Sequence, residues 1–164
     1  TKSTPRSYQQ YIFEQAKKEN VIAVLETGTG KTLISIMLIE HVMTVMKNSD
    51  DESIKSKKIV MLTPNTLLAK QQASSIREEL DLKHEDDIDV YLGDSGVLDL
   101  HSAKSQRMKK KKILVMTPQV FQHLLSHCQL KMDNIALLIL DECHHCMEDH
   151  PYRVVMKHFY HTAK

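Results

Sequence analysis

The sequence contains one short segment whose residue types suit phosphate binding. Glu26–Thr32 (ETGTGKT) follows the apolar run Val21–Leu25 and precedes a long apolar pattern of helical period. Gly28 and Gly30 permit a backbone turn in which successive N–H groups point at one cluster of phosphate oxygens. A helix that begins near Lys31 adds the positive end of its dipole at the same place. The segment therefore predicts a nucleotide-binding loop in a strand–loop–helix context.

Two side chains at the end of this loop supply further groups for a nucleotide. Lys31 offers a cation for the β- and γ-phosphates, and Thr32 offers a hydroxyl ligand for Mg²⁺. The common pattern for such loops begins with a glycine, at a position where this chain has Leu25. A glycine-rich turn that binds no nucleotide is the alternative interpretation of the same residues.

A pair of adjacent carboxylates is the second feature whose residue types suit catalysis. The apolar run Ala136–Leu140 leads directly into Asp141 and Glu142. Because side chains alternate along a strand, two neighbours at a strand end can perform different tasks. We expect Asp141 to hold Mg²⁺ and Glu142 to orient and deprotonate the water that attacks a γ-phosphate. With Lys31, these two residues form the predicted catalytic set.

The residues after this pair allow a different interpretation, a zinc site. Cys143–Cys146 (CHHC) has the spacing C-x-x-C, and His150 follows closely. Such residues can hold Zn²⁺ when a second pair of ligands lies at a suitable distance. The sequence contains no second pair at such a distance, so zinc is the weaker alternative.

Apolar runs alternate with helical patterns along the chain. The expected strands are Val21–Leu25, Lys58–Thr63, Asp89–Leu92, Ile113–Thr117 and Ala136–Asp141. The expected helices are Ser7–Lys18, Lys31–Met46, Thr66–Leu80, Pro118–His127 and a last one from Pro151 to about Tyr160. Most strands are nearly unbroken Val, Ile, Leu and Met runs, typical of parallel strands covered on both faces. The alternation predicts an α/β fold, a mostly parallel sheet with helices on both faces.

Two polar segments interrupt this alternation. Lys47–Lys57 is expected to be a mobile surface loop, and Gly93–Lys112 has no place in the pattern of strands and helices. The second segment contains the only concentrated basic run, Lys104, Arg107 and Lys109–Lys112. We interpret this run as a solvated loop, with an RNA or protein contact as the alternative. No domain boundary is visible, so residues 1–164 are expected to form one domain.

Length and composition exclude several classes of protein. The 164 residues suffice for a single core, and 41% hydrophobic with 26% charged residues is typical of a globular protein. A formal net charge of +1 excludes a polybasic, tail-type nucleic-acid binder but allows local phosphate contacts. The apolar runs are too short to span a membrane. Three cysteines without a secretory signal lead us to expect a cytoplasmic or nuclear protein. Because the sequence does not begin with Met, we expect it to be a fragment of a longer protein.

Several motifs, taken in order, resemble a known helicase family. Asp141–His144 (DECH) resembles motif II of the Dicer and innate RNA-sensor branch of superfamily 2, and His150–His161 is similar to the segment after that motif in Dicer-like proteins. The other similar motifs are a Q-type motif at Arg6–Gln9, motif Ia at Leu62–Pro64 with Gln71 and Gln72, and motif Ib at Thr117–Val120. The resemblance extends over nearly the whole chain.

The resemblance implies a fold, an activity and a set of partners. The fold is the first RecA-like lobe of a P-loop NTPase, and the activity is that of a double-stranded-RNA-dependent ATPase or helicase of Dicer type, acting in RNA silencing. ATP and Mg²⁺ are the implied ligands. Double-stranded RNA and the second RecA-like lobe of the same parent chain are the implied partners. Because the arginine finger of such enzymes belongs to that second lobe, the isolated lobe is expected to be inactive.

The loop chemistry and the resemblance together define the candidate residues. The nucleotide-binding set is Arg6, Gln9, Glu26, Thr27, Gly28, Thr29, Gly30, Lys31 and Thr32, with Thr32 and Asp141 on Mg²⁺. The resemblance further implies that Gln9 reads the adenine edge and that His144 couples the nucleotide site to the second lobe. The implied RNA contacts are Thr63, Pro64, Thr117 and Pro118.

Three other functions fit parts of this pattern. An innate-type RNA sensor shares the DECH motif. A DNA-repair translocase of superfamily 2 usually carries DEAH, so Cys143 counts against it. A non-hydrolysing nucleotide-binding scaffold is opposed by the intact Lys31, Thr32, Asp141 and Glu142.

Overall fold

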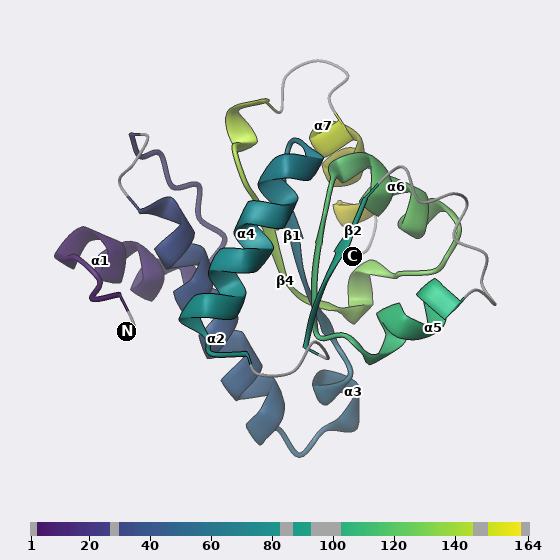
Figure 1. Ribbon diagram of the computed structural model, residues 1–164, viewed down its shortest axis with the longest axis horizontal. Coiled ribbons are helices and arrows are strands. Elements are labelled where there is room, and N and C mark those ends of the chain that lie inside the picture. The colour runs from purple at the N-terminus through teal and green to yellow at the C-terminus, as the bar shows by residue number, and fades with distance from the viewer. Residues whose placement is uncertain (1–2, 27–29, 83–86, 93–102, 146–150, 162–164) are drawn as a thin grey trace.

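A sheet of four parallel strands forms the centre of the molecule. The computed structural model describes residues 3–26, 30–82, 87–92, 103–145 and 151–161. The strands are β1 Lys58–Leu62, β2 Ile88–Tyr91, β3 Ile113–Met116 and β4 Ile135–Leu140, in the order β2-β3-β1-β4. Helices lie on both faces of this sheet (Figure 1). The predicted α/β fold with a parallel sheet is confirmed.

The side chains of the central strands alternate between two cores. Ile59 and Met61 of β1 belong to one core and Val60 and Leu62 to the other, and each is at most 1% exposed. The helices α2 (Lys31–Asn48) and α4 (Thr66–Glu79) complete the first core, and α6 (Pro118–Ser126) and α7 (Pro151–Val155) complete the second. Because both faces are covered, the side chains of Ile59–Leu62 are apolar on both faces, which explains the unbroken run after Lys58.

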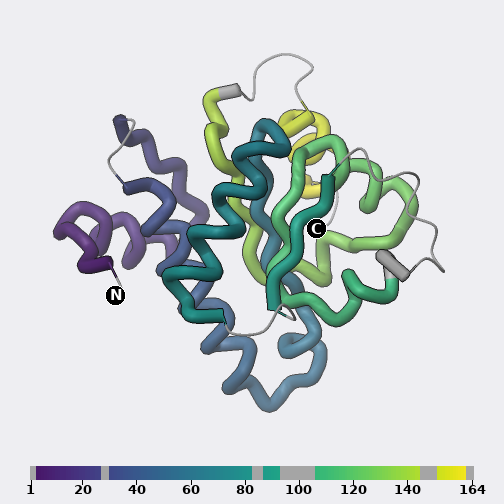
Figure 2. Tube along the Cα trace, in the orientation of Figure 1, coloured from purple at the N-terminus to yellow at the C-terminus, as the bar shows by residue number. Residues whose placement is uncertain are grey.

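Local sequence signals set the starts of the helices. The Asn65 side chain accepts the N–H of Leu68 at 2.9 Å and caps α4. Pro118 occupies the first turn of α6, where its missing N–H costs no hydrogen bond. The first helix, α1 (Ser7–Ala16), packs against α2 (Figure 2). The rings of Phe13 and His41 meet there edge to face, with centroids 5.9 Å apart. None of the described helices is long and apolar enough to cross a membrane.

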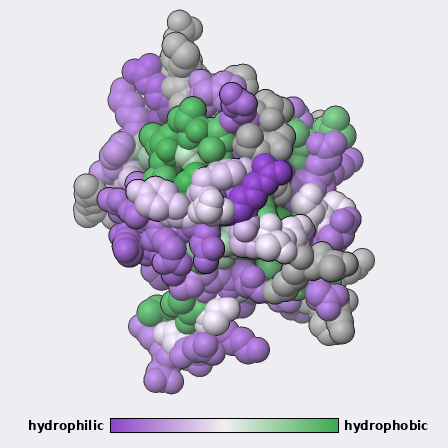
Figure 3. Space-filling view, turned by 90° about the vertical axis from the view of Figure 1, so that its left-hand side faces the viewer, coloured by the Kyte–Doolittle hydropathy of each residue, from purple (hydrophilic) through white to green (hydrophobic). Residues whose placement is uncertain are grey.

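The predicted strand Val21–Leu25 is wrong. These residues form no strand, and Val21, Ile22 and Val24 are 40%, 80% and 89% exposed. A strand needs a neighbour for its backbone N–H and C=O groups, and among the described residues β4 pairs only with β1. Within the described residues, the apolar run does not pair with the other edge of β4, and it lies largely at the surface. Figure 3 shows the side of the molecule that carries α1, where hydrophobic side chains are open to solvent.

Two segments that were expected to be loops contain helices. The helix α2 continues to Asn48, and a short helix, α3 (Glu52–Lys55), follows it. The Asp51 side chain caps α3 by accepting the N–H of Ser53 at 2.8 Å. A further helix, α5 (Ala103–Lys110), lies in the second segment and is anchored by Met108, which is 4% exposed. Residues 93–102 of that segment lie outside the described residues.

The basic run is partly built into the fold. Lys111 is 3% exposed, so the expectation of a fully solvated run is wrong. The ammonium group of Lys58, at the start of β1, donates to the carbonyl oxygens of Lys109 and Lys111 at 2.6 Å each. Burial lowers the pKa of Lys58 to about 8, and the nearby charge of Lys112 contributes to the same shift. Lys58 thus binds backbone carbonyl oxygens at and just after the C-terminal end of α5.

Candidate nucleotide site

The start of α2 and the end of β4 bring the predicted phosphate-binding and acidic residues together. Asp141 follows β4, and its N–H donates to the carbonyl oxygen of Leu62 at 2.9 Å, which holds it beside the carboxyl end of β1. The ammonium nitrogen of Lys31 lies 3.9 Å from a carboxylate oxygen of Glu142. Two segments far apart in the sequence therefore meet at one edge of the sheet, where parallel α/β sheets bind ligands.

Gly30 occupies a backbone conformation that its neighbours require. It precedes α2 with φ 81° and ψ 36°, in the left-handed region that favours glycine. A Cβ atom at this position would lie 2.4 Å from the amide nitrogen of Gln9, closer than any real contact allows. Thr27, Gly28 and Thr29 lie outside the described residues, so the predicted cradle of N–H groups rests on Gly30 and the start of α2.

Gln9 joins the first helix to this loop. Its side chain is 3% exposed, and its amide nitrogen donates to the carbonyl oxygen of Gly30 at 3.1 Å. Its amide oxygen accepts the backbone N–H of Arg6 at 2.7 Å. The structure thus places Gln9 against the phosphate loop, while the side chains of Arg6 and Glu26 are exposed. The predicted contact between Gln9 and an adenine edge stays a prediction.

Glu142 stands between two positively charged or chargeable groups. One carboxylate oxygen faces the Lys31 ammonium, and the other lies 3.2 Å from Nδ1 of His144. Its backbone has φ 53°, a left-handed conformation that costs a residue other than glycine about 1–3 kcal/mol. Lys31 and Glu142 are 35% and 34% exposed, so water and a ligand can reach both. A strained, accessible carboxylate beside a cation suits a group that acts on a water molecule.

Asp141 is held more firmly than its neighbour. One carboxylate oxygen accepts the N–H of Glu142 at 3.1 Å, and the other accepts the amide nitrogen of Gln72 at 3.2 Å. The buried hydroxyl of Tyr152 lies 2.7 Å from the carbonyl oxygen of Asp141 and 3.0 Å from that of Leu62, and donates to this pair. Burial raises the pKa of the Asp141 carboxyl, and the negative charge of Glu142 raises it further.

The oxygen groups at this edge fit a magnesium ion. The Thr32 hydroxyl and the Asp141 carboxylate both lie within 3.3 Å of one nitrogen, the amide of Gln72. When Mg²⁺ also binds a substrate phosphate, it takes only a few ligands from the protein, and these are hard oxygen atoms. For the zinc alternative, Cys143 is partly exposed, while Cys146 and His150 lie outside the described residues. Within the described residues no three His, Cys, Asp or Glu side chains are grouped to hold a metal.

The predicted RNA contacts lie in two adjacent loops at the same edge. Thr63 follows β1 and Thr117 follows β3, and the N–H of Thr63 donates to the carbonyl oxygen of Met116 at 3.0 Å. The side chains of Thr63 and Thr117 are buried, as is Pro118, and Pro64 is half-buried. The hydroxyl of Thr63 donates to the carbonyl oxygen of Asn65 at 3.1 Å. The hydroxyl of Thr63 is therefore bonded within the chain, while Thr117 is the N-cap residue of α6 and makes no side-chain cap hydrogen bond.

Two residues of the site carry no signal in the sequence that would identify their contacts. Gln72 belongs to the motif Ia resemblance and lies in α4 between Gln71 and the buried Ala73, but only the structure reveals its bonds to Thr32 and Asp141. Tyr152 resembles a core aromatic residue, and its hydroxyl contacts depend on the return of α7 to the end of β4. Sequence spacing does not predict contacts of this kind because they form between elements.

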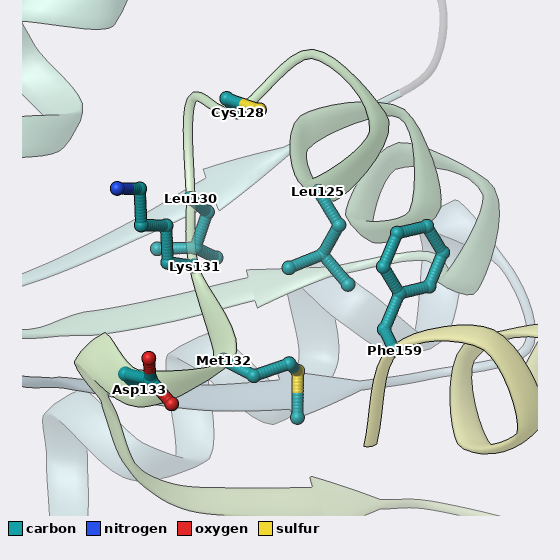
Figure 4. A pocket seen from close by; sticks show the side chains of 7 residues that line it. All are labelled: Leu125, Cys128, Leu130, Lys131, Met132, Asp133 and Phe159. Atoms are coloured by element: carbon teal, nitrogen blue, oxygen red, sulfur yellow. The ribbon is translucent and has the colours of Figure 1, made fainter. Parts of the chain in front are cut away.

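A shallow hollow of about 240 Å³ lies elsewhere on the molecule. It is lined by Leu125, Cys128, Leu130, Lys131, Met132, Asp133 and Phe159 (Figure 4). These residues precede β4 or belong to the C-terminal segment, whereas Asp141 follows β4. None of the predicted site residues lines the hollow, so it is not the nucleotide site.

Comparison with known proteins agrees with this geometry. The chain matches the DEAD/DEAH box helicase family over residues 6–164. It is 42% identical to Endoribonuclease Dicer homolog 1 of Arabidopsis thaliana over 96% of this chain and 8% of that protein, and 36% identical to Dicer-like protein 1 of Aspergillus niger over 95% of this chain and 10% of that protein. The chain thus spans about a tenth of these relatives.

A solved structure supports the same assignment. The helicase domain of Hef from Pyrococcus furiosus superimposes with a TM-score of 0.79 at 28% identity, over 98% of this chain and 31% of that one. The superposition, the family match and the relatives agree on a helicase domain. The chain belongs to the DEAD/DEAH box helicase family.

Proposed function

We propose that this chain is the ATP-binding first RecA-like lobe of a double-stranded-RNA-dependent ATPase of Dicer type, acting in RNA silencing. The observation that carries the proposal is the convergence of Lys31, Thr32, Asp141 and Glu142 from two distant segments. Similarity to Dicer proteins at 35–42% identity favours this type over other superfamily 2 helicases such as Hef, at 28%. Because the chain covers only part of those relatives, the activity belongs to the full-length protein.

The residues of the site divide the work on ATP. Lys31 binds the phosphates as a cation, and the backbone N–H groups at the start of α2 bind the same oxygens. Thr32 and Asp141 would hold Mg²⁺, which supplies charge neutralisation on the phosphates when it is bound. Glu142 orients the attacking water and accepts its proton, and Lys31 opposite it keeps the carboxylate at the phosphate side of the site.

The remaining candidate residues link this chemistry to the partners. His144 lies beside Glu142 and is 66% exposed, and it would contact a second lobe that closes over the site. Gln9 would read the adenine edge in the closed enzyme. The loops that begin at Thr63 and Thr117 would contact the RNA backbone, through their main chain rather than their buried hydroxyls.

The test is ATP hydrolysis by the full-length protein with and without double-stranded RNA. Lys31→Ala should abolish both nucleotide binding and turnover, since it removes charge that binds the ground state. Glu142→Gln should retain nucleotide binding and lower turnover by about 10²-fold or more, since it removes the base.

Lys70→Ala, on the exposed side of α4, is the matched control and should leave both quantities unchanged. Hydrolysis by Glu142→Gln within a few-fold of the unsubstituted protein would exclude Glu142 as the base. Equal stimulation by single-stranded and double-stranded RNA would contradict the Dicer-type assignment while leaving the ATPase intact.

A further inference from the structure

Gln72 bridges the two residues that are assigned to Mg²⁺. It lies in α4, and its amide nitrogen is 3.3 Å from the hydroxyl oxygen of Thr32 and 3.2 Å from a carboxylate oxygen of Asp141. A primary amide carries two N–H groups, so one nitrogen can donate to both oxygens. Thr32 belongs to α2 and Asp141 follows β4, so the amide fixes the separation of two groups that come from different elements.

The other end of the same amide is buried without a protein donor. The carbonyl oxygen of Gln72 has no hydrogen-bond partner among the described residues, although the residue as a whole is half-buried. A buried acceptor without a donor is unfavourable and is usually satisfied by water or a ligand. An amide oxygen only accepts, so its partner must be an O–H or N–H group.

A magnesium ion brings donors of the required kind. Mg²⁺ gives up its water reluctantly and keeps several water molecules when few protein groups bind it. The O–H groups of those waters are donors, and an uncharged amide oxygen accepts them without adding charge to the site. The nitrogen of Gln72 is meanwhile occupied by the two groups that hold the ion, which leaves its oxygen as the available acceptor.

We propose that Gln72 is a positioning residue of the magnesium site, whose nitrogen holds Thr32 and Asp141 in place and whose oxygen accepts a hydrogen bond from water on the bound ion. The inference rests on the proposed function, because it requires the Mg²⁺–nucleotide complex as substrate. It makes Gln72 responsible for metal affinity rather than for nucleotide affinity as such.

The experiment measures the binding of a fluorescent ADP analogue to the full-length protein, first with excess EDTA and then during titration with Mg²⁺. Gln72→Met keeps the length of the side chain and removes its hydrogen bonds. In EDTA, the nucleotide affinity of this variant should stay within about twofold of that of the unsubstituted protein. The Mg²⁺ concentration at half-saturation should rise about three- to tenfold, the loss expected for one or two hydrogen bonds. Gln71→Met, the exposed neighbour on α4, should change neither quantity.

Each other result overturns the inference. An unchanged Mg²⁺ midpoint in Gln72→Met would exclude a role at the metal. A fall of the thermal midpoint and of nucleotide affinity in EDTA, with an unchanged Mg²⁺ midpoint, would make Gln72 a structural support for α4.

Gln72→Asn keeps the amide but withdraws it by one methylene. It should shift the Mg²⁺ midpoint in the same direction, and it replaces the methionine variant if that one does not fold. Failure of the unsubstituted protein to bind the ADP analogue would overturn the proposed function as well, which separates the two failures.

Discussion

Asp141 and Glu142 are adjacent in sequence but occupy different environments. Asp141 is half-buried, and both of its carboxylate oxygens accept hydrogen bonds. The backbone of Glu142 turns into the left-handed region, and its carboxylate faces the Lys31 ammonium and His144. The first arrangement suits a fixed ligand, and the second suits a base that must reach a mobile water. The two roles therefore follow from a single backbone turn at the end of β4.

The raised pKa of Asp141 has a consequence for stability. Burial raises this pKa in the folded chain, so between the unfolded and folded pKa values the folded chain binds more protons than the unfolded chain. Stability from this group is therefore present at low pH and is lost as the pH rises through the folded pKa. At neutral pH and without Mg²⁺, the buried Asp141 carboxyl therefore makes the fold less stable than it is at low pH.

Asp141→Asn should therefore stabilise the metal-free chain at neutral pH while it abolishes catalysis. The neutral amide removes the cost of the buried charge, and Gln72 can turn its own amide so that its oxygen accepts from Asn. The gain should shrink towards zero as the pH falls well below about 4, where the unfolded carboxyl is also protonated. Urea unfolding in EDTA at both pH values measures it, with Asp133→Asn at an exposed position as control. Lower stability of Asp141→Asn than of the unsubstituted chain at neutral pH would contradict this prediction.

At the scale of elements, apolar runs predict strands only where a partner exists. The runs at β1 and β3 are buried on both faces and paired on both edges, and their prediction from the sequence is confirmed. The run Val21–Leu25 has a similar apolar composition, yet it is largely exposed and unpaired. Pairing depends on which strand edge the rest of the fold brings beside a run, and no local pattern reports it.

The short helices in the charged segments were not predicted, for a related reason. α5 is almost entirely polar, and a single buried apolar residue, Met108, fixes it to the core. α3 is four residues long and depends on the Asp51 cap. Periodicity needs several apolar positions to be visible, so neither helix was predictable from its pattern. The same holds for the site. The residue types of Lys31 and Asp141 identified them as candidates in the sequence, whereas the bridging contact of Gln72 could not be predicted.

The exposed run should make the isolated chain associate with itself. Ile22 and Val24 are exposed apolar residues, and one edge of β4, which pairs with no strand in the described part of the chain, offers backbone groups to another strand. The double substitution Ile22→Lys and Val24→Lys should reduce self-association of the 164-residue chain in sedimentation velocity. It should change the free energy of unfolding by less than about 0.5 kcal/mol per site, because the side chains are at the surface.

Tyr11→Lys provides the control for this prediction. Tyr11 is 67% exposed and lies in α1, outside the sheet, so its removal should leave self-association unchanged. Equal loss of association in Tyr11→Lys would assign the effect to general surface hydrophobicity. Unchanged association in the double variant would show that the run and the edge do not mediate it.

At the scale of the whole molecule, the site is one wall of a cleft in the proposed two-lobe enzyme. Lys31 and Glu142 are each about a third exposed, and His144 more so, on a face that the described residues leave open. An electrostatic site becomes strong when water is excluded from it. The expected arginine of a second lobe would both close the cleft and stabilise charge on the γ-phosphate. In the proposed enzyme, this lobe therefore carries the residues that bind the nucleotide and some of the residues that act in catalysis.

The isolated 164-residue chain should fold, bind ATP–Mg²⁺ weakly and hydrolyse it barely or not at all. It should fold because the sheet is covered on both faces by its own helices, even though the run Val21–Leu25 lacks the strand partner that we expected. It should bind weakly because Lys31, Thr32 and Asp141 are present and the opposite wall is not. It should not turn over because the charge on the transferred phosphoryl group lacks its arginine.

Calorimetry with ATP and phosphate release with and without duplex RNA measure these properties. Lys31→Ala in the same chain is the control and should remove the residual binding. RNA should not restore hydrolysis, because RNA stimulates such enzymes by closing two lobes on each other, and one lobe has nothing to close upon. RNA-stimulated hydrolysis by the isolated chain at the rate of the full-length protein would place the whole catalytic apparatus in these residues. In that case, the exposure of Lys31 and Glu142 would have to reflect a cleft that this lobe closes by itself.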